Sequence, residues 1–462
     1  MRLCLHDTVK NVKMREMSSL SSQPYKGTRD WYPEDKRIQN YIFKMWRETA
    51  ESFGYEEYGA PLLEPIEVYA AKSGLELVNE QTYVFTDRGE RTVAIRPEMT
   101  PSISRMVAAR RQELAYPARL YSIANFMRYE RPQRGREREF WQLNLDLFGV
   151  ESVLADAEII SYGAEMLKKF GATPDMFTIR VNNRVVVDAM MRDYLGLDEV
   201  GAHLMVKLFD RKNKISNEEF RDQAIEIFGH ERASDGLKKI SDLLMTKDID
   251  SAPAELAHNE AFMALRELFE ELKKAKVTNA VFDITLMRGL DYYTGTVFEF
   301  FDTDPENNRS LFGGGRYDGL VGLFGAEPIS AVGMAPGYTT TELFLKSHNL
   351  LPQMNSTTEA YVIVLSEELR KTASKLARDF RNEGVRAELD ITGRKLDKQL
   401  KTALKKKIPF LVFVGHDEAE KEIYTFKDTT LEVEHHYSFA RMVAAIKDRR
   451  RVGKDELDEL FE

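Results

Sequence analysis

The sequence predicts an α+β domain built around an antiparallel sheet, a helical insertion within that domain, and a smaller α/β domain at the C-terminus. Three patterns carry this prediction. The strand-like segments 118–128 and 140–148 are joined by a polar loop, which favours a hairpin with antiparallel pairing. Residues 187–276 are helix-like and highly charged, without a glycine-rich or site-like pattern. After residue 360, strand-like and helix-like segments alternate, which is typical of a small parallel or mixed sheet.

The elements of the larger domain, residues 24–345, follow from periodicity and turn residues. A helix is predicted between residues 25 and 53, because apolar side chains recur there at helical spacing and Gly54 can end it. The other expected elements are a helical stretch at 101–114, before the two central strands, and strands at 280–285 and 297–301, after the insertion.

The C-terminal domain is expected at residues 359–448, after a polar linker at 346–358 and before a charged tail at 449–462. Within it, Ser366 is expected to cap a helix that ends at Gly384. The remaining elements alternate as strands at 361–365, 385–389 and 410–414 and a helix at 396–404.

Composition limits the class of protein. The 462 residues suffice for roughly two to four domains. A hydrophobic content of 43% with 31% charged residues indicates a globular chain and excludes wholesale disorder. No apolar run approaches the roughly 18–20 residues of a membrane-spanning helix. The net charge of −9 argues against a purely electrostatic nucleic-acid binder, whereas local basic segments remain available for RNA.

The rarer residue types and the N-terminus add three expectations. The single cysteine, Cys4, cannot form an internal disulfide, which fits a reducing cytosol. The eight histidines are scattered without metal-ligand spacing, so no metal site made by the protein alone is predicted. Residues 1–23 are expected to be a disordered leader, with Met14 or Met17 as an alternative start; a targeting peptide is the competing interpretation.

The strand at 140–148 is the most informative segment for function. Alternation places Gln142, Asn144 and Asp146 on one face, and Trp141 with three leucines on the other. The polar face suits a small polar ligand. A solvated sheet surface is the alternative explanation of the same pattern.

The loop before this strand is rich in arginine. Its guanidinium groups are Arg131, Arg134, Arg136 and Arg138, with Arg128 at the end of the preceding strand. Such groups can bind a polyphosphate bidentately, although nearby glutamates make a balanced surface loop equally consistent with the sequence. The cluster Gly313-Gly314-Gly315 lacks the Gly-Lys-Ser/Thr of a phosphate-binding loop, and turns with positive φ explain it equally well. The residues alone therefore indicate an arginine-rich site for an anionic ligand.

The C-terminal domain contains the densest basic stretch of the chain. It begins with Arg394, Lys395 and Lys398 and continues to Lys407, with Asp397 as its single acidic residue. A solvated helix face and a contact with a phosphate backbone both fit this pattern.

Four segments, taken together and in order, resemble the motifs of histidyl-tRNA synthetases, which are class II aminoacyl-tRNA synthetases. They are Lys26-Gly27-Thr28-Arg29-Asp30, Tyr58-Gly59-Ala60-Pro61, Phe126-Met127-Arg128-Tyr129-Glu130-Arg131-Pro132-Gln133 and Leu286-Met287-Arg288-Gly289-Leu290-Asp291-Tyr292-Tyr293. The last is similar to the histidine-specific signature, and the C-terminal unit is similar to a class IIa anticodon-binding domain. The resemblance implies a cytoplasmic homodimer that has Pro61 at its interface. It also implies that the dimer uses ATP with Mg²⁺ to join L-histidine to histidine tRNA.

The resemblance also implies roles for individual residues. Arg128 and Arg288 are expected to be catalytic. The histidine-binding set is Glu98, Met99, Thr100, Gln142, Asp146, Tyr292 and Tyr293. The ATP-binding set is Arg128, Glu130, Arg136, Phe140 and Arg288. Contacts with tRNA are expected from Gln133 and Arg134 at the acceptor end, and from Arg394, Lys395 and Lys398 in the anticodon domain.

Two departures from the family pattern stand out. Asp146 occupies a position where the family implies glutamate. The motif 3 region, residues 331–342, carries no arginine, and Thr340 aligns with the arginine that the family places against the ATP γ-phosphate. Either another cation such as Arg316 substitutes, or ATP binding is weakened.

The missing arginine leaves other functions open. One is a histidine-binding, synthetase-like regulatory subunit of histidine biosynthesis that does not charge tRNA. Such subunits generally lack the anticodon domain and an intact signature with both arginines, whereas this chain keeps both. Another is an RNA-binding protein without catalysis, which would bind tRNA without ATP turnover.

Overall fold

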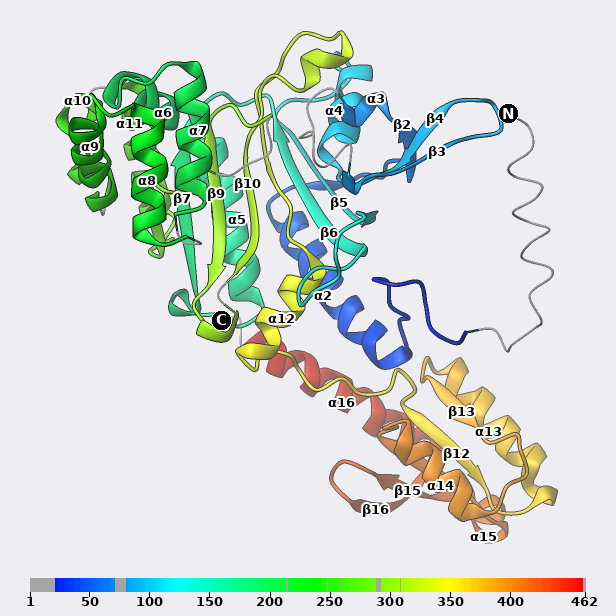
Figure 1. Cartoon of the computed structure of the whole chain (residues 1–462). Helices are drawn as coiled ribbons and strands as arrows, with labels where there is room; N and C mark the ends of the chain where they lie inside the picture. Colours follow the sequence, from blue (N-terminus) through cyan, green and yellow to red (C-terminus); the bar gives the residue numbers. More distant parts are fainter. Residues whose placement is uncertain are drawn as a thin grey trace. The chain divides into compact units, whose positions relative to one another are not determined.

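The computed structural model describes residues 21–70, 80–212, 215–246, 248–257, 259–287, 292–307 and 309–459; for residues 257 and 451–459 it describes the backbone alone. The expected leader therefore lies almost wholly outside the described residues, as does the segment from Arg288 to Asp291. The chain divides into two compact units, Met1–Leu351 and Pro352–Glu462 (Figure 1). Each unit is described by itself below.

An eight-stranded sheet forms the centre of the first unit, in the order β1-β5-β6-β11-β10-β9-β7-β8. Its strands are β1 (Glu56–Glu57), β5 (Ala118–Met127), β6 (Glu139–Phe148), β7 (Phe177–Asn183), β8 (Ala280–Phe282), β9 (Thr296–Asp302), β10 (Ser310–Arg316) and β11 (Ala331–Met334). The pairings are antiparallel except at the two edges, where β1 runs parallel to β5 and β8 runs parallel to β7. The predicted hairpin is present, with Ala118 opposite Phe148 and Met127 opposite Glu139.

Helices cover the two faces of this sheet unequally. On one face α2 (Pro33–Ser52), α5 (Val153–Lys169) and α12 (Tyr338–Ser347) share a hydrophobic core with the leucines of β6. The other face is partly covered by α4 (Thr100–Ala109) and the short helix η6 (Val321–Phe324), which pack around Phe148 and Tyr317. The polar side of β6 faces this second side of the sheet, where Asn144 and Asp146 are buried and Gln142 is half-buried.

The sequence of α2 explains its start and its buried face. Pro33 begins the helix, where a missing N–H has no consequence, and Glu34 and Asp35 carry negative charge near the positive end of the helix dipole. Ile42 and Trp46 are fully buried against the sheet. The predicted helix is confirmed, and it ends just before Gly54, whose φ of 79° suits glycine.

A helical segment connects β7 to β8, as predicted for residues 187–276. It contains α6 (Arg184–Ala189), the π-helical turn η3 (Met190–Tyr194), α7 (Glu199–Asp210), α8 (Asn217–Phe228), α9 (Ala233–Met245), the short helix η4 (Ile249–Ser251), α10 (Ala254–Ala257) and α11 (Glu260–Lys274). Asp198, Ser216 and Asn259 cap α7, α8 and α11 by accepting backbone hydrogen bonds. The apolar side chains of this segment belong to the same hydrophobic cluster as those of the sheet.

A small three-stranded sheet lies beside α3 (Glu67–Ala70) and α4, in the order β2-β4-β3. Its strands are β2 (Leu63–Pro65), β4 (Thr92–Ile95) and β3 (Tyr83–Thr86), all antiparallel. Leu62, Leu63, Val84 and Phe85 expose between 43% and 46% of their surface. These apolar side chains are therefore left partly uncovered by the residues that the structure describes.

The glycine cluster lies in a strand and not in a turn, so the turn interpretation is wrong. Gly313, Gly314 and Gly315 are part of β10, between β9 and β11. A Cβ atom on Gly314 would lie 2.2 Å from the carbonyl oxygen of Gly333, and on Gly315 it would lie 2.7 Å from that of Thr296. Close approach of neighbouring strands, and not a positive φ, requires glycine here.

The second unit contains a mixed sheet in the order β13-β12-β14-β15-β16. Its strands are β12 (Ala360–Val364), β13 (Ala387–Leu389), β14 (Phe410–Val414), β15 (Ile423–Asp428) and β16 (Val433–Ser438), and its helices are η7 (Glu367–Leu369), α13 (Arg370–Asn382), α14 (Leu396–Lys405), α15 (His416–Lys421) and α16 (Phe439–Glu459). The first three strands are parallel, and the last two are antiparallel. The predicted α/β alternation is present.

Two details of this unit differ from the sequence prediction. Ser366 makes no side-chain capping bond, because a short 3₁₀ turn, η7, separates it from α13. The expected charged tail begins inside α16, where Arg449 pairs with Asp428 and Arg450 pairs with Glu359. These ion pairs keep the start of the tail packed on the unit.

Candidate active site

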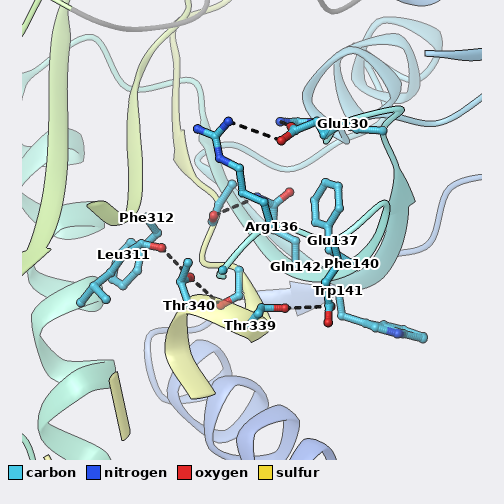
Figure 2. A pocket seen from close by; sticks show the side chains of 14 residues that line it. Glu130, Arg136, Glu137, Phe140, Trp141, Gln142, Leu311, Phe312, Thr339 and Thr340 are labelled. Atoms are coloured by element: carbon cyan, nitrogen blue, oxygen red, sulfur yellow. Dashed lines mark hydrogen bonds and ion pairs between the residues drawn. The ribbon is translucent and has the colours of Figure 1, made fainter. Parts of the chain in front are cut away.

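A cavity of about 240 Å³ lies where the β5–β6 loop, β6, β10 and the start of α12 meet (Figure 2). It is lined by Arg128, Glu130, Gly135, Arg136, Glu137, Phe140, Trp141, Gln142, Leu311, Phe312, Ala335, Gly337, Thr339 and Thr340. All the described members of the expected ATP-binding set, together with Gln142, thus face one cavity. The arginine-rich loop is part of a concave site and not merely a balanced surface loop.

The loop between β5 and β6 is a tight hairpin. Gln133 and Arg136 form an isolated β-bridge around Gly135, which has a φ of 79°. Glu130 lies beneath the hairpin, 3.4 Å from the Arg136 guanidinium and 4.0 Å from that of Arg128, and Figure 2 shows the first of these contacts. One carboxylate between two guanidiniums leaves a net positive charge at this side of the cavity.

Arg128 joins this hairpin to the segment before α4. Its Nε donates a 2.9 Å hydrogen bond to the carbonyl oxygen of Pro97, and its guanidinium lies 5.2 Å from the centre of the Phe140 ring. The contact with Phe140 is within the range of a cation–π interaction. The ring therefore lines the cavity beside a positive charge.

The opposite wall comes from β11 and α12. Gln142 Nε2 donates to the carbonyl oxygen of Ala335 at 2.9 Å, and Thr339 Oγ1 donates to Glu137 at 3.1 Å. Burial raises the pKa of Glu137, although the nearby Arg29 opposes the shift. These contacts fix the start of α12 against the strand that carries the polar face.

Asp146 lies farther along that face, and its side chain is buried. Tyr317 donates a 2.5 Å hydrogen bond to Asp146 Oδ1, and Oδ2 has no hydrogen-bond partner among the described residues. Burial raises the pKa of Asp146 to about 7, although the hydrogen bond from Tyr317 opposes the shift. The unpaired oxygen is an available acceptor for the N–H of a small ligand.

The tyrosines of the expected signature lie close to this buried carboxyl group. Tyr292 donates a 2.9 Å hydrogen bond to Glu98, and its ring lies 5.1 Å from that of Tyr293 and 5.9 Å from that of Tyr317. Burial raises the pKa of Tyr292 well above its usual value, and the charge of Glu98 adds to this effect. Glu98, both tyrosines and Asp146 are therefore brought together, and the polar face of β6 is not a solvated surface.

Met99 and Thr100 lie at the start of α4. The Met99 side chain is buried in a hydrophobic cluster with Ala124 and Phe126, so that it can contribute only apolar packing. Thr100 is the first residue of α4, and Met99 is its N-cap.

Comparisons with known proteins identify the family. Residues 27–339 match the family model for histidyl-tRNA synthetase. The histidine–tRNA ligase of Leptospira biflexa serovar Patoc is 40% identical over 431 residues, covering 93% of this chain and 98% of that protein. That of Thermococcus kodakarensis is 36% identical over 415 residues, covering 87% and 93%. The chain belongs to the histidyl-tRNA synthetase family. The resemblance of its motifs and the expected class of enzyme, an aminoacyl-tRNA ligase, are thereby confirmed.

Solved structures agree with the fold. The histidyl-tRNA synthetase from Nostoc sp. PCC 7120 has a TM-score of 0.79 at 24% identity, and the match covers 93% of this chain and 100% of that one. A chain described as an ATP phosphoribosyltransferase regulatory subunit/histidyl-tRNA synthetase from Bacillus halodurans C has a TM-score of 0.70 at 25% identity, covering 86% and 99%. Residues 359–449 match the family model for an anticodon-binding domain. The predicted fold class is confirmed.

Arg316 cannot replace the arginine that this synthetase lacks in motif 3. Its guanidinium is buried, lies 2.5 Å from Asp156 and donates further hydrogen bonds to the carbonyl oxygens of Val150 and Ser152. Arg316 is also absent from the lining of the cavity. The expectation that it substitutes is wrong, because its charge is already neutralised within the core.

The sequence did not point to Tyr317 as part of the site. It lies directly after β10, the strand that contains the glycine cluster, and it hydrogen-bonds to Asp146. An aromatic residue with a hydroxyl group, directly after closely packed glycines, was the available signal. Arg288 lies outside the described residues, so its predicted role stays a prediction.

In the anticodon-binding domain, the basic stretch is only partly free to bind. Arg394 lies 2.8 Å from Asp390. Although burial alone would raise it, hydrogen bonds from Thr392 and Arg394 hold the pKa of Asp390 well below its usual range. Lys395 and Lys398 are exposed, so they supply the accessible charge at the start of α14.

Among the described residues, no helix combines the length and apolar character needed to cross a membrane. Within the same residues, no group of three or more histidine, cysteine, aspartate or glutamate side chains could hold a metal ion.

Proposed function

We propose that the chain activates L-histidine with ATP to form histidyl-adenylate, and then transfers the histidyl group to the 3′ end of histidine tRNA. The match of residues 27–339 to the family carries this proposal. The cavity supports it, because two arginines, Arg128 and Arg136, line it beside Phe140, and its two glutamates, Glu130 and Glu137, leave both guanidiniums in reach of a phosphate group.

The first step requires little proton transfer from the protein. A histidine carboxylate is ionised at neutral pH, so its oxygen can attack the α-phosphorus without a general base. The bond from phosphorus to the bridging oxygen breaks, and pyrophosphate leaves with that electron pair. The protein aligns the reactants and neutralises charge on the phosphoryl oxygens, a role that we assign to Arg128 and Arg288.

We assign the binding of histidine to the polar face of β6 and its neighbours. Glu98, Thr100 and Gln142 hold the α-amino end. Asp146 and Tyr293 bind the imidazole ring, for which the unpaired Asp146 Oδ2 is a suitable acceptor. A site built around buried hydrogen bonds rejects an amino acid that lacks the matching groups by roughly 10⁴–10⁵-fold. Two further residues, Tyr292 and Met99, line the pocket.

ATP is assigned to the cavity of about 240 Å³. The Phe140 ring stacks on adenine, and Arg136 binds the phosphates. Glu130 also belongs to this ATP-binding set and would be the carboxylate that holds Mg²⁺ together with the phosphates. This set fits the metal, since Mg²⁺ is usually held by one or two carboxylates together with substrate phosphates. When bound, Mg²⁺ neutralises negative charge on the phosphate oxygens.

The tRNA contacts are assigned to both units. Gln133 and Arg134, at the exposed tip of the hairpin, contact the acceptor end, whereas Arg394, Lys395 and Lys398 contact the anticodon region. The anticodon-binding domain supports the second assignment.

We further propose a homodimer that works in the cytoplasm. The apolar side chains exposed on and beside the three-stranded sheet (Leu62, Leu63, Val84 and Phe85) provide a surface for a second copy. Pro61 directly precedes this surface in the sequence, as the motif 1 resemblance implies. A single cysteine in the sequence fits a reducing compartment.

A regulatory subunit that binds histidine without charging tRNA is the second candidate. The similar Bacillus halodurans chain is named for both functions, and the absence of arginine from residues 331–342 favours reduced ATP binding. The anticodon-binding domain at residues 359–449 favours the ligase, because binding histidine alone does not need it.

Histidine-dependent ATP–pyrophosphate exchange separates these candidates. The ligase predicts exchange with histidine and none with the other amino acids. A folded protein that binds histidine, with an affinity measurable by calorimetry, but gives no exchange would favour the regulatory subunit and exclude the ligase.

A further inference from the structure

A second cavity adjoins the candidate ATP site. Its volume is about 450 Å³, and its lining shares Gly135, Arg136, Leu311 and Thr340 with that of the first cavity. The Thr340 hydroxyl donates to the carbonyl oxygen of Leu311 at 2.6 Å, so these two residues contact each other in the wall that the two cavities share. A ligand that passes Arg136 thus has space beyond it.

The second cavity is strongly basic. Three arginines, Arg134, Arg136 and Arg309, line it, with Glu306 as the one acidic residue in its lining. Arg309 is exposed and forms no ion pair with any of the described residues, in contrast to Arg136, which is paired with Glu130. The Arg309 charge is therefore available to an anion.

Arg309 is held in place although it lies in a loop. Its Nη1 donates a 2.7 Å hydrogen bond to the carbonyl oxygen of Arg134, which ties it to the tip of the hairpin. The loop that carries it is anchored by the buried Asp302, which accepts hydrogen bonds from the backbone N–H of Asp304 and the side chain of Asn307, and lies 2.8 Å from His348 Nε2. A guanidinium that is already hydrogen-bonded to the hairpin and carried by an anchored loop loses less freedom when it binds.

We propose that Arg309, together with Arg134 and Arg136, binds the terminal phosphates of ATP and the pyrophosphate that leaves. In this way it supplies the positive charge that motif 3 lacks at Thr340. The inference rests on the proposed function. Arginine suits the role, because its fork binds phosphate oxygens bidentately and it stays charged at any working pH.

The geometry favours a polyphosphate over the acceptor end of RNA. The arginines follow one another from Arg128, which lines the first cavity, through Arg136 in the shared wall to Arg309 in the second cavity. A chain of phosphates extending from the first cavity meets them in that order. RNA as the ligand remains an outcome that the experiment identifies.

The test compares Arg309→Ala and Arg309→Lys with the unaltered chain in histidine-dependent ATP–pyrophosphate exchange without tRNA. Arg221→Ala is the matched control, since it removes an exposed guanidinium on α8, outside both cavities. Arg309→Ala is expected to raise KM for ATP by roughly 10- to 100-fold, the loss typical of one charge-assisted hydrogen bond. Arg309→Lys keeps the charge, so its KM for ATP should lie between those of Arg309→Ala and the unaltered chain. KM for histidine should change much less in both variants.

AMP is the probe that separates direct contact from a general disturbance. It lacks both terminal phosphates, so its inhibition constant should be the same for Arg309→Ala and the unaltered chain. An equal loss of AMP and ATP binding, or a Lys variant as poor as Ala, would overturn the inference. Unchanged exchange combined with weaker tRNA charging would do so too, and would assign Arg309 to RNA. Absence of exchange in the unaltered chain would instead reject the proposed function itself.

Discussion

The Asp146 carboxyl group is expected to gain or lose its proton within the pH range of ordinary assays. Its carboxyl has a pKa of about 7 in the folded chain, against about 3.9 in an unfolded one. The folded state therefore holds an extra proton between these values, and the free energy of unfolding falls as the pH rises from about 4 to 7, by up to about 4 kcal/mol. Asp146→Asn cannot titrate, so we expect it to remove this fall.

Denaturant unfolding at pH 5 and pH 8, without histidine, measures the effect. The stability of the variant relative to the unaltered chain should be higher at pH 8 than at pH 5 by roughly 3 kcal/mol, because the unaltered chain loses about 1.4 kcal/mol for each pH unit between 5 and 7. Asp193→Asn, which changes an exposed aspartate in η3, is the control and should leave the pH dependence as it is. Parallel curves for Asp146→Asn and the unaltered chain would mean that Asp146 is ionised throughout.

For single residues, the sequence predicted the features that depend only on neighbours in the chain, such as the face of a strand on which a side chain lies. Alternation along one strand was enough to place Gln142 and Asp146 on the same face. Tyr317, which hydrogen-bonds to Asp146, is 171 positions away, so only the order of the strands brings it there. Arg309 was missed for the same reason, because it meets Arg134 across 175 positions.

Strand β10 is the element whose sequence was hardest to interpret. Glycines mark tight turns and closely packed strands alike, so the cluster 313–315 did not identify its own structure. The structure resolves the ambiguity through β9 and β11, which pair with β10 on its two sides. In contrast, regular alternation allowed β5 and β6 to be predicted to within about one residue at each end, a typical boundary uncertainty.

The packing of β10 predicts that alanine in place of Gly314 destabilises the fold much more than alanine in place of the nearby Gly319. Gly314→Ala would place a methyl group 2.2 Å from the backbone oxygen of Gly333, whereas Gly319→Ala would meet no atom within 4 Å. We expect Gly314→Ala to lower the free energy of unfolding of the first unit by about 1–3 kcal/mol or more, since overpacking against a backbone cannot relax. Gly319→Ala should change it by about 0.5 kcal/mol or less.

Thermal and denaturant unfolding of both variants would test this difference. Histidine-dependent exchange at a temperature where both variants are folded would show whether the strand shift also reaches Asp146, which lies opposite Gly333. Equal stabilities would contradict the close packing of β10 and β11.

The whole molecule combines a site for small molecules with a second unit that has its own sheet. The division into two units was predictable, because the polar stretch before residue 359 and the α/β alternation after it differ sharply from the preceding domain. The helical character of the segment between β7 and β8 was predicted, whereas the packing of its apolar side chains into the core of the sheet was not, because its sequence carries no motif that marks this contact. Its function has no signature in the sequence.

A tRNA that bridges both units predicts that changes in the second unit affect transfer and leave activation alone. Lys395→Ala combined with Lys398→Ala removes two exposed charges at the start of α14. We expect kcat/KM for tRNA to fall. The slope of log(kcat/KM) against log[salt] should become shallower by about 1.4–1.8, because two fewer phosphate contacts mean that fewer counterions are released when tRNA binds. Lys371→Ala with Lys375→Ala, which removes the same charge from α13, is the control and should leave the slope unchanged. Pyrophosphate exchange without tRNA should be the same in the two double variants and the unaltered chain.

Equal slopes for the two double variants would show that α14 does not contact the tRNA backbone and that the basic stretch is a solvated helix face.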